Sequence, residues 1–543
     1  MIKLPTPQEL GLPDKFEKLR PNQEAALELL LTYRHLRIKS LCMPTGSGKT
    51  LVYVMYALIT REPTCFVTHT LGLQDQISGE YASIGMVDLR GRGQYQCGLK
   101  DEYSCEEGFA AKCPYKGTIA CPEAAASMRA AISPLVVTNY SKWTYAKKYG
   151  VGMSHFTQVV FDEGHFAPKA IAAVMQVTLH HREIEEVLGL TFPGYPDFNE
   201  VINWKPWAVR ARTVAEEHRL KYQSKIQNSS NPKPAWVKEV THMKNLIRRL
   251  GTLSTASPSY WVADEVEAGF QFDPISPAKY GEAMLLMNTP SVIFISATMT
   301  TKTMAMTGIG KAGQKPIEGG IVCDKYVFVE YDSDFDPKDC PIYYIPTQRV
   351  DNKHPDRRML WMRLDQFLAR RQDRKGIVGT ISHARREEIM ISSSYQSKMI
   401  FNERGEPAAQ IVEDYKKAGP GTILVSPSIG TGYDFPGSLC EFIFLCKVPM
   451  EPPSKIVKAR EHLDKEYRGY TALQAMEQHF GRGARFRGDP CEGVIPDDNL
   501  MDWFMRSFGH LATRTFHKRF KVLDKVPSPP PKYVEPIRVK NVR

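Results

Sequence analysis

The chain has 543 residues, 71 of them Lys or Arg and 60 Asp or Glu, which gives a formal net charge of +11. Its apolar fraction of 42 % is typical of a globular protein, and no apolar run approaches the ~20 residues of a membrane span. The N-terminal segment lacks a signal-peptide core. These features argue against a membrane partner and for a cytoplasmic protein. They predict three or four domains of roughly 100–200 residues each and favour a polyanionic partner.

Apolar, strand-like runs alternate with helical stretches along most of the chain, beginning with a helix predicted at residues 20–34. This alternation predicts an α/β fold with parallel sheets. The strand-like runs begin at Cys65, Leu135, Gln158, Ser291, Ile377, Ile423 and Phe442.

Two segments interrupt this alternation. Residues 93–129 are rich in cysteine and poor in strand signal, and residues 173–285 look mostly helical. Within the second segment, a polar turn at residues 227–234 separates helical runs at residues 207–226 and 236–250. This pattern predicts a helical hairpin inserted into a sheet domain.

Residues Met43 to Thr50, with the sequence Met-Pro-Thr-Gly-Ser-Gly-Lys-Thr, lie between two apolar runs. A strand, a glycine-rich loop and a helix in this order form a phosphate-binding loop, whose N–H groups wrap the phosphates of ATP. Lys49 would reach the terminal phosphates, and the Thr50 hydroxyl would bind Mg²⁺. An ordinary glycine-rich turn is the alternative, which the later motifs argue against. The other nucleotide-binding residues expected in this loop are Thr45, Gly46, Ser47 and Gly48.

An acidic pair, Asp162 and Glu163, follows the apolar run that starts at Gln158. At the end of a buried strand such a pair can meet the phosphate loop, whereas an exposed acidic pair is the alternative. Asp162 would hold Mg²⁺ through water, and Glu163 would polarise the attacking water. The tripeptide Ser296-Ala-Thr298 ends another strand, and its hydroxyls can relay contacts between nucleotide and nucleic acid. A simple turn is the alternative there.

The segment Gln478-His-Phe-Gly-Arg-Gly-Ala-Arg485 has the spacing Gln-x-x-Gly-Arg-x-x-Arg. Arg482 and Arg485 are three residues apart and share a helix face. Two arginines aimed at the γ-phosphate would neutralise the charge that develops in the transition state. An exposed basic helix is the alternative. Because these residues lie far along the chain from the phosphate loop, they predict a second domain that closes on ATP.

Taken together, the motifs resemble those of superfamily 2 helicases, and within them the XPD/DinG family of iron–sulfur DNA helicases, over roughly residues 15–520. The phosphate loop with Met43 is similar to the XPD form. Arg20-Pro-Asn-Gln23 looks like the family's glutamine motif, which implies that Gln23 reads adenine. Phe66 to Gln76 is similar to motif Ia, which implies contacts from Thr68 or Thr70 to the phosphates of the strand.

Further along the chain, Gly430-Thr-Gly-Tyr-Asp-Phe435 resembles motif V, with Gly432 and Asp434 matching as nucleotide-site residues. The resemblance also implies that His165 couples the nucleotide state to nucleic-acid binding. Two positions depart from the family pattern, since Gly164 replaces Ala and Thr431 replaces Glu.

Four cysteines recur every eight residues, at a place where the family inserts its cluster domain. They are Cys97, Cys105, Cys113 and Cys121. Four thiolates suit an iron–sulfur cluster, which the resemblance implies is 4Fe-4S. Zinc is the rival because it also takes four cysteines, although no Cys-x-x-Cys pair occurs. A segment without metal is the third interpretation.

Basic and aromatic side chains interleave along the cysteine segment, among them Arg92, Tyr95 and Lys112. This mixture suits the backbone and bases of single-stranded DNA, and a solvated basic face is the alternative. In the family, the cluster module and a helical arch frame a hole for the translocated strand. The hairpin within residues 173–285 would be that arch.

The resulting domain map has two RecA-like motor domains and two inserts. We expect the first motor domain at residues 1–92, 130–172 and 286–340, the four-Cys insert at 93–129, the arch insert at 173–285, the second motor domain at 341–526 and a Pro-rich tail at 527–543.

These observations predict an ATP-dependent DNA helicase that uses ATP and Mg²⁺ on single-stranded and forked DNA. The resemblance implies 5′ to 3′ movement and a monomer. The compact inserts and short N-terminal segment favour an enzyme of a bacterial cell or a phage-infected host. Its pathway stays open among DNA replication restart, R-loop removal, DNA repair and phage DNA metabolism. Two alternatives stay open. One is an RNA helicase or double-strand translocase, and the other is an ATP-latched DNA clamp that does not unwind.

Overall fold

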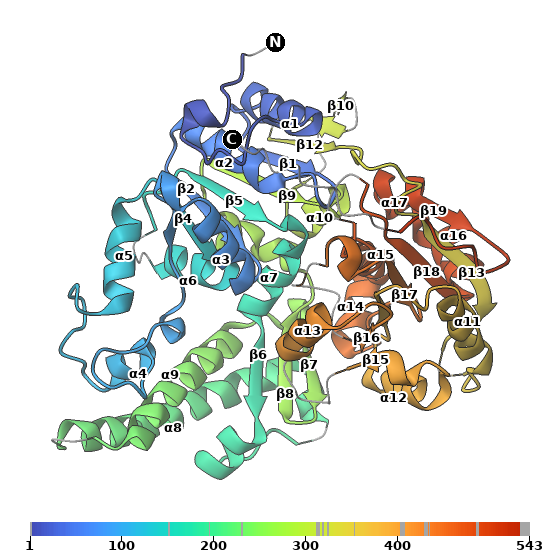
Figure 1. Ribbon diagram of the computed structural model, residues 1–543. Coiled ribbons are helices and arrows are strands. Elements are labelled where there is room, and N and C mark those ends of the chain that lie inside the picture. The colour runs from blue at the N-terminus through green and yellow to red at the C-terminus, as the bar shows by residue number, and fades with distance from the viewer. Residues whose placement is uncertain are drawn as a thin grey trace.

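Buried apolar runs in each half of the chain form the central strands of two separate sheets. The strands β1 (Ile38–Cys42) and β5 (Gln158–Asp162) are buried at every position, as expected for parallel strands covered on both faces. The computed structural model shows two α/β domains with a helical hairpin projecting from the first (Figure 1). It describes residues 3–149, 153–194, 196–229, 232–310, 315–317, 320–322, 325–351, 353–401, 408–427, 433, 435–484 and 488–532.

The first domain is built on a nine-stranded sheet with the order β10-β11-β12-β1-β9-β5-β2-β4-β3. Its strands run parallel from β12 to β3, whereas β10, β11 and β12 pair antiparallel at one edge. The other strands are β2 (Thr64–Thr68), β3 (Val87–Asp88), β4 (Leu135–Asn139), β9 (Ser291–Ser296), β10 (Lys315–Ile317), β11 (Gly320–Val322) and β12 (Tyr326–Glu330).

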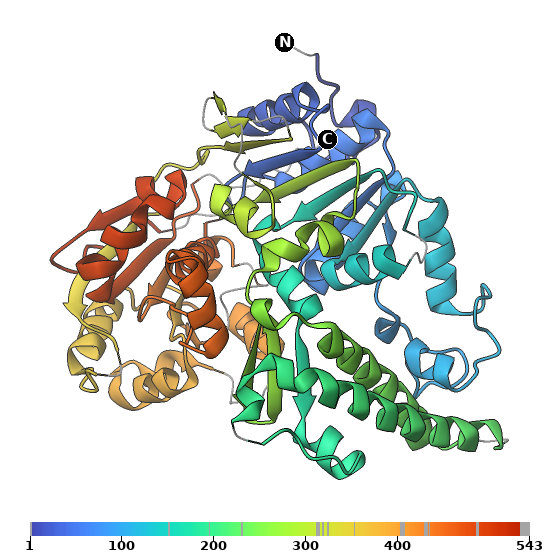
Figure 2. The ribbon, with the colours of Figure 1, turned by 180° about the vertical axis from the view of Figure 1, so that it is seen from behind.

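The second domain has a seven-stranded, fully parallel sheet with the order β15-β16-β14-β17-β18-β13-β19. Figure 2 shows this sheet beside the first one, with helices on both faces of each. Its strands are β13 (Ile342–Gln348), β14 (Gly376–Gly379), β15 (Met399–Ile400), β16 (Ile423–Ser426), β17 (Phe442–Leu445), β18 (Glu492–Asp497) and β19 (Phe520–Val522).

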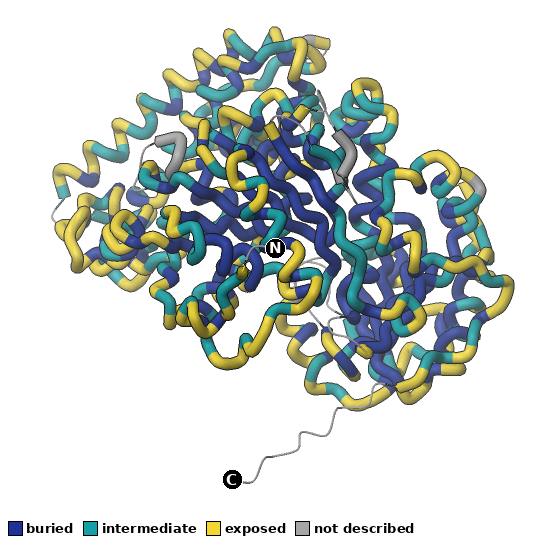
Figure 3. The backbone as a smooth tube through the Cα atoms, turned by 90° about the horizontal axis from the view of Figure 1, so that it is seen from above, coloured by how far each residue is buried: buried dark blue, intermediate teal, exposed yellow. Residues whose placement is uncertain are grey.

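Helices cover both sheets and leave the strands buried between them (Figure 3). In the first domain these are α1 (Pro21–Thr32), α2 (Lys49–Thr60), α3 (Leu71–Glu80), α6 (Tyr140–Tyr149), α7 (Ala167–Met175) and α10 (Thr301–Met306). In the second domain they are α11 (Arg358–Ala369), α12 (His383–Ser392), α13 (Ala408–Lys417), α14 (Lys455–Leu463), α15 (Tyr467–Phe480), α16 (Met505–Phe508) and α17 (Arg514–Arg519).

The two segments that interrupt the α/β pattern form separate structures. The cysteine-rich segment carries the short helices α4 (Cys105–Ala110) and α5 (Pro122–Ile132). The hairpin consists of α8 (Val201–Gln227) and α9 (Pro234–Thr255), which pack along their length through small and apolar residues such as Ala208, Ala211 and Leu250.

The hairpin segment is less helical than the sequence predicts. A three-stranded antiparallel sheet lies at the base of the hairpin and has the order β6-β8-β7. Its strands are β6 (Val177–His180), β7 (Trp261–Val266) and β8 (Gly269–Pro274). β7 and β8 are joined by residues 267 and 268 alone, whereas β6 precedes both helices of the hairpin, so no local apolar pattern marks the three as one sheet.

Candidate functional site

The phosphate-loop segment connects β1 to α2, and its backbone takes a shape that glycine adopts most readily. Gly46 and Gly48 have φ angles of 74° and 73°, in the left-handed region. A Cβ on Gly48 would lie 2.3 Å from Nε2 of Gln23, so a larger residue would have to displace that amide. The Ser47 hydroxyl is buried and has no hydrogen-bond partner in the part of the chain that is described. An orphaned donor in this loop fits a phosphate oxygen.

Gln23 braces this loop from α1. Its Nε2 donates to the carbonyls of Ser47 at 3.0 Å and Gly48 at 3.2 Å, and its Oε1 accepts from the N–H of Arg20 at 2.9 Å. The guanidinium of Arg20 adds a 2.7 Å bond to the carbonyl of Gly46. The resemblance to the glutamine motif implies that Gln23 reads adenine, and that role would require its amide to exchange these loop bonds for bonds to the base.

The acidic pair lies at the same edge of the sheet as the phosphate loop. Strand β9 separates β1 from β5, all three run parallel, and Asp162 is the last residue of β5. The Tyr53 hydroxyl of α2 donates to Asp162 Oδ2 at 3.3 Å and ties the pair to the phosphate-loop helix. Glu163 has a φ of 50°, rare for a residue with a side chain and typical of strained functional positions.

The surroundings of the two carboxyl groups shift their pKa values in opposite directions. Burial raises the pKa of Asp162 to about 7, and the charge of Glu163 adds to this effect. Burial also raises the pKa of Glu163, but the hydrogen bond with His165 and the charge of Lys49 outweigh burial and hold this pKa below its usual value. Glu163 is therefore charged at neutral pH, as a base for water must be. Mg²⁺ beside Asp162 would keep that carboxylate ionised as well.

His165 connects the acidic pair to the end of β9. Its Nδ1 lies 2.7 Å from the Ser296 hydroxyl and 3.3 Å from Glu163 Oε2, and Ser296 itself donates to Glu163 at 3.2 Å. The Nε2 atom of His165 is buried and has no hydrogen-bond partner in the described chain. The structure thus brings together the predicted coupling residues His165 and Ser296.

The second domain approaches this site with the end of α15. Gln478 Nε2 donates to Thr298 Oγ1 at 2.9 Å, and the charge of Arg482 acts on Glu163 across the domain boundary. Arg482 also donates to the carbonyl of Tyr433 at 2.9 Å. The predicted site residues Arg485, Gly432 and Asp434 lie outside the described residues.

The four predicted ligand cysteines converge in the module between β3 and β4. All are buried, and the Sγ atoms of Cys105 and Cys121 are 3.6 Å apart. A Cβ on Gly108 would lie 2.1 Å from the Sγ of Cys97 and 3.8 Å from the Cβ of Cys113, so these two also face one place. No group of three or more Cys, His, Asp or Glu in the described ranges is arranged around a single metal ion. Four thiolates are the donor number of an iron–sulfur cluster and equally of a four-cysteine zinc site.

The predicted nucleic-acid contacts divide into inward-facing and outward-facing residues. Thr68 is buried, and its hydroxyl donates to the carbonyl of Thr70 at 3.2 Å, whereas Thr70 caps α3 and is half-buried. The hydroxyl of Tyr95 accepts from the N–H of Arg90, and its ring packs against Cys105 and Cys121. Lys112 is exposed.

An aromatic side chain surrounded by cations forms a surface that the sequence alone does not predict. The ring centroid of Phe109 lies 3.8 Å from Lys116 Nζ, 5.1 Å from the Arg92 guanidinium carbon and 5.7 Å from Lys244 Nζ. Lys244 belongs to α9 of the hairpin and is far from Phe109 in the sequence. We call these four residues the Phe109 cluster; Phe109 itself is 36 % exposed.

Two family models match the chain. Residues 16–192 match "Type III restriction enzyme, res subunit", and residues 377–507 match "Helicase C-terminal domain". The first match contains the phosphate loop and the acidic pair, and the second contains the Gln478–Arg482 segment. The chain is a helicase built from these two domains. As an ATP-hydrolysing helicase it requires both domains, because the phosphate loop and Arg482 lie on different ones.

Solved structures of similar fold confirm the prediction of two RecA-like domains. "XPD_Helicase" is 14 % identical with a TM-score of 0.65, and "XPD_APO" is 13 % identical with a TM-score of 0.61. "Structure of S. tokodaii Xpd4" is 12 % identical with a TM-score of 0.59. Each alignment covers 93 % of this helicase and 100 % of the other chain. No curated protein sequence matches this helicase.

Within the ranges that are described, no helix is both long and apolar enough to reach across a bilayer.

Proposed function

We propose that this helicase moves 5′ to 3′ along single-stranded DNA and uses ATP hydrolysis to unwind forked duplexes. The observation that carries the proposal is the packing of the cysteine module against the tip of the hairpin. Cys97 and Cys113 share an apolar cluster with Ile226 of α8 and with Val237 and Val240 of α9. A module braced in this way holds the Phe109 cluster rigidly beside the hairpin.

The Phe109 cluster supports single-stranded DNA as the substrate. An exposed ring stacks on bases whatever their sequence, and cations around it neutralise neighbouring phosphates. Duplex DNA keeps its bases stacked inside, so a ring of this kind gains little from it. Lys112 and Thr70 extend the set of contacts that we assign to the strand.

The four cysteines are assigned to a 4Fe-4S cluster, with zinc as the alternative metal. Cys97, Cys105, Cys113 and Cys121 would hold the cluster, which would staple α4 and α5 into one rigid body. Their burial and convergence fit this donor role. Iron, labile sulfide and zinc measured after anaerobic purification distinguish the two metals. A Cys105→Ser variant should lose the metal, whereas Cys65→Ser, which alters a buried cysteine in β2, should retain it.

At the nucleotide site each residue receives one role. Lys49 and the loop from Thr45 to Gly48 hold the phosphates, Thr50 and Asp162 bind Mg²⁺, and Glu163 activates water. Gln478, Arg482 and Arg485 stabilise the transition state from the second domain. Gln23, Gly432 and Asp434 complete the contacts to the nucleotide. His165, Ser296 and Thr298 couple the state of the nucleotide to the binding of nucleic acid.

Strand separation on two duplexes, identical except for a 5′ or a 3′ single-stranded tail, tests this function. Unwinding only from the 5′ tail is expected with ATP and Mg²⁺. Unwinding only from the 3′ tail would overturn the polarity. ATP turnover stimulated by RNA without DNA unwinding would identify an RNA enzyme, and turnover without any strand separation would identify a translocase or a clamp.

A further inference from the structure

One face of helix α15 contacts the first domain through residues that are spaced by about one helical turn. Tyr470, Gln474 and Gln478 are spaced by four residues and therefore lie one above another. All three reach the segment from Thr298 to Thr303, which directly follows Ser296 in the first domain. Arg482 continues the same spacing just beyond the end of the helix.

Residues of this face that lie farther from the nucleotide site make more hydrogen bonds to the first domain. Gln478, the nearest of the three, donates to the hydroxyl of Thr298 at 2.9 Å. Gln474 Nε2 donates to the Thr298 carbonyl at 3.1 Å and to Thr303 Oγ1 at 3.3 Å. The Tyr470 hydroxyl accepts from the N–H of Thr300 at 3.3 Å and from its Oγ1 at 2.9 Å.

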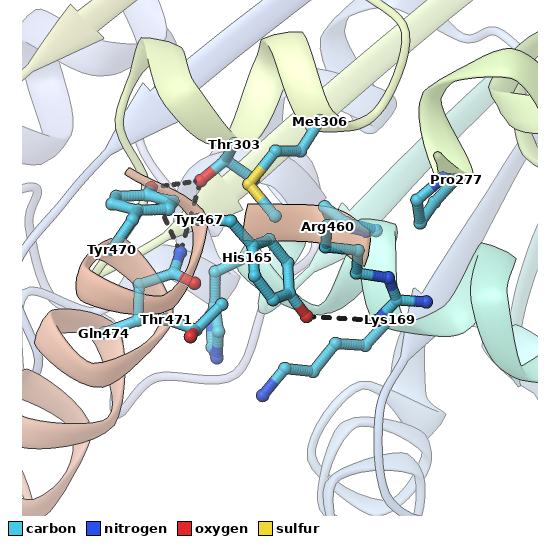
Figure 4. Close-up of a pocket in the computed structure, with 11 residues that line it drawn as sticks. His165, Lys169, Pro277, Thr303, Met306, Arg460, Tyr467, Tyr470, Thr471 and Gln474 are labelled. Atoms are coloured by element: carbon cyan, nitrogen blue, oxygen red, sulfur yellow. Dashed lines mark hydrogen bonds between the residues drawn. The ribbon is translucent and has the colours of Figure 1, made fainter. Parts of the chain in front are cut away.

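Two further groups complete the surroundings of the Tyr470 hydroxyl. It lies 2.6 Å from Thr303 Oγ1, and it accepts from Gln474 Nε2 at 3.1 Å. Tyr470 is 1 % exposed, so these bonds are shielded from water. One buried hydroxyl thus joins α15 of the second domain to the start of α10 in the first, as Figure 4 shows beside the cleft between the domains.

The same cleft leads back to the acidic pair. Its lining includes His165 of the first domain, together with Thr303, Tyr470 and Gln474 (Figure 4). His165 contacts Ser296 and Glu163, as described above, and Gln478 contacts Thr298 two residues further along. A displacement of α15 along its axis would therefore change the position of Arg482 relative to Glu163.

We infer that Tyr470 is a positioning residue for ATP hydrolysis: its hydroxyl fixes the register of α15 against Thr300 and Thr303, and so sets where Arg482 meets the nucleotide. Tyr470 is twelve residues before Arg482, or about 18 Å along a helix at 1.5 Å per residue, so it does not touch the reacting atoms. This inference rests on hydrolysis at the site between the domains and is independent of polarity, DNA preference and metal.

The chain offers a matched control on the same helix. Tyr467 is also buried and lines the same cleft. Its hydroxyl accepts a hydrogen bond from Arg460 at 3.0 Å and donates one to Glu451 at 3.2 Å. Both partners belong to the second domain and also contact the first, Arg460 through the carbonyls of Pro274 and Ile275 and Glu451 through Lys169. Tyr467→Phe therefore removes a comparable bond beside the same cleft but leaves the bonds of Tyr470 to Thr300 and Thr303 in place.

The test is a steady-state measurement of ATP turnover with a saturating single-stranded oligonucleotide. Tyr470→Phe is expected to lower kcat about ten-fold with KM for ATP changed less than about two-fold, since ATP still binds but Arg482 is misplaced. Tyr467→Phe should keep kcat within about two-fold of the wild type. Thr303→Val removes the same bond from the first domain and should repeat the effect of Tyr470→Phe.

A double-mutant cycle separates positioning from a merely structural role. In an Arg482→Ala background, Tyr470→Phe should cause no further loss of kcat, because the residue through which it acts is gone. An equal loss in both backgrounds would overturn the inference. So would a Tyr470→Phe enzyme with wild-type kcat, or a Tyr467→Phe enzyme that loses as much as Tyr470→Phe.

Discussion

Gly481 of the second domain lies directly against Thr45 of the phosphate loop. A Cβ on Gly481 would come within 3.1 Å of Thr45 Cγ2 and within 3.2 Å of the carbonyl oxygen of Glu477. The two domains therefore touch at the place where the phosphates of ATP would lie. This close contact between the domains depends on glycine at position 481, because a side chain there would crowd Thr45.

Gly481→Ala should impair closure of the domains on ATP. The added methyl group has to push Thr45 or α15 aside by a few tenths of an ångström, and Arg482 follows at once in the sequence. We expect kcat for ATP to fall about ten-fold while the thermal midpoint changes little. Gly419→Ala is the control because a Cβ there meets nothing within 4 Å. An unchanged kcat in Gly481→Ala would contradict the tight contact.

Glu163→Gln should abolish most hydrolysis and leave ATP binding intact. The amide cannot take a proton from water, and loss of a general base costs about 100- to 10,000-fold in rate. KM for ATP should stay near the wild-type value, because Lys49 and the loop amides still hold the phosphates. Glu24→Gln, an exposed position on α1, serves as the control. Substantial turnover by Glu163→Gln would assign the base to another residue.

The buried carboxyl group of Glu477 should make the stability of this helicase depend on pH. Burial raises its pKa from 4.5 to about 8, although the N–H of Thr513 donates to it at 2.9 Å and opposes the shift. Between pH 4.5 and 8 the folded chain therefore holds a proton at Glu477 that the unfolded chain releases. The contribution of this group to stability is complete below that window and is lost as pH rises through it, by up to about 1.4 kcal/mol per pH unit.

Urea-unfolding midpoints of the wild type and Glu477→Gln, compared across this window, measure the effect. The urea midpoint of the variant should rise relative to that of the wild type as pH increases through the window. Above pH 8 the difference between the two midpoints should stay constant. A constant difference at all pH values would mean that Glu477 ionises normally in the folded chain.

Some features of the fold and site follow from the sequence because they depend on local pattern. Met43 to Thr50 predicts a glycine-rich phosphate-binding loop, and the run before Asp162 predicts a buried strand, since both signals lie within a few residues. The pairing of β6 with β8 and the approach of Lys244 to Phe109 join residues far apart in the chain. The inward direction of Thr68 and Tyr95 likewise follows from packing, which composition does not reveal.

Lys244→Ala should weaken binding to single-stranded DNA at low salt and reduce its salt dependence. If Lys244 neutralises one phosphate, the slope of log affinity against log salt concentration falls by about 0.7 for a single strand. Phe109→Ala should weaken binding by about 1–3 kcal/mol with an unchanged slope, since stacking releases no counterions. Lys221→Ala, an exposed lysine on α8, provides the control. Equal slopes for Lys244→Ala and the wild type would remove Lys244 from the DNA path.

The buried ion pair between Arg371 and Glu492 should dominate the stability of the second domain. Both side chains are 0 % exposed, and two bonds of 2.5 and 2.7 Å join them. Arg371→Leu leaves a buried carboxylate without its partner, a change that costs about 3–5 kcal/mol. Replacing both residues by leucine removes the charge as well and should recover much of that loss.

The exposed pair between Arg358 and Asp356 is the natural comparison, because Arg358 is 86 % exposed and its ion pair is 2.6 Å long. Arg358→Ala should change the stability little, since water screens the interaction. Urea unfolding of the wild type, Arg371→Leu, the double leucine variant and Arg358→Ala ranks their free energies of unfolding. If Arg371→Leu were no worse than Arg358→Ala, Glu492 would have to be protonated in the folded domain, in keeping with burial raising the pKa of Glu492. In that case the loss from Arg371→Leu should reappear at higher pH, where Glu492 ionises.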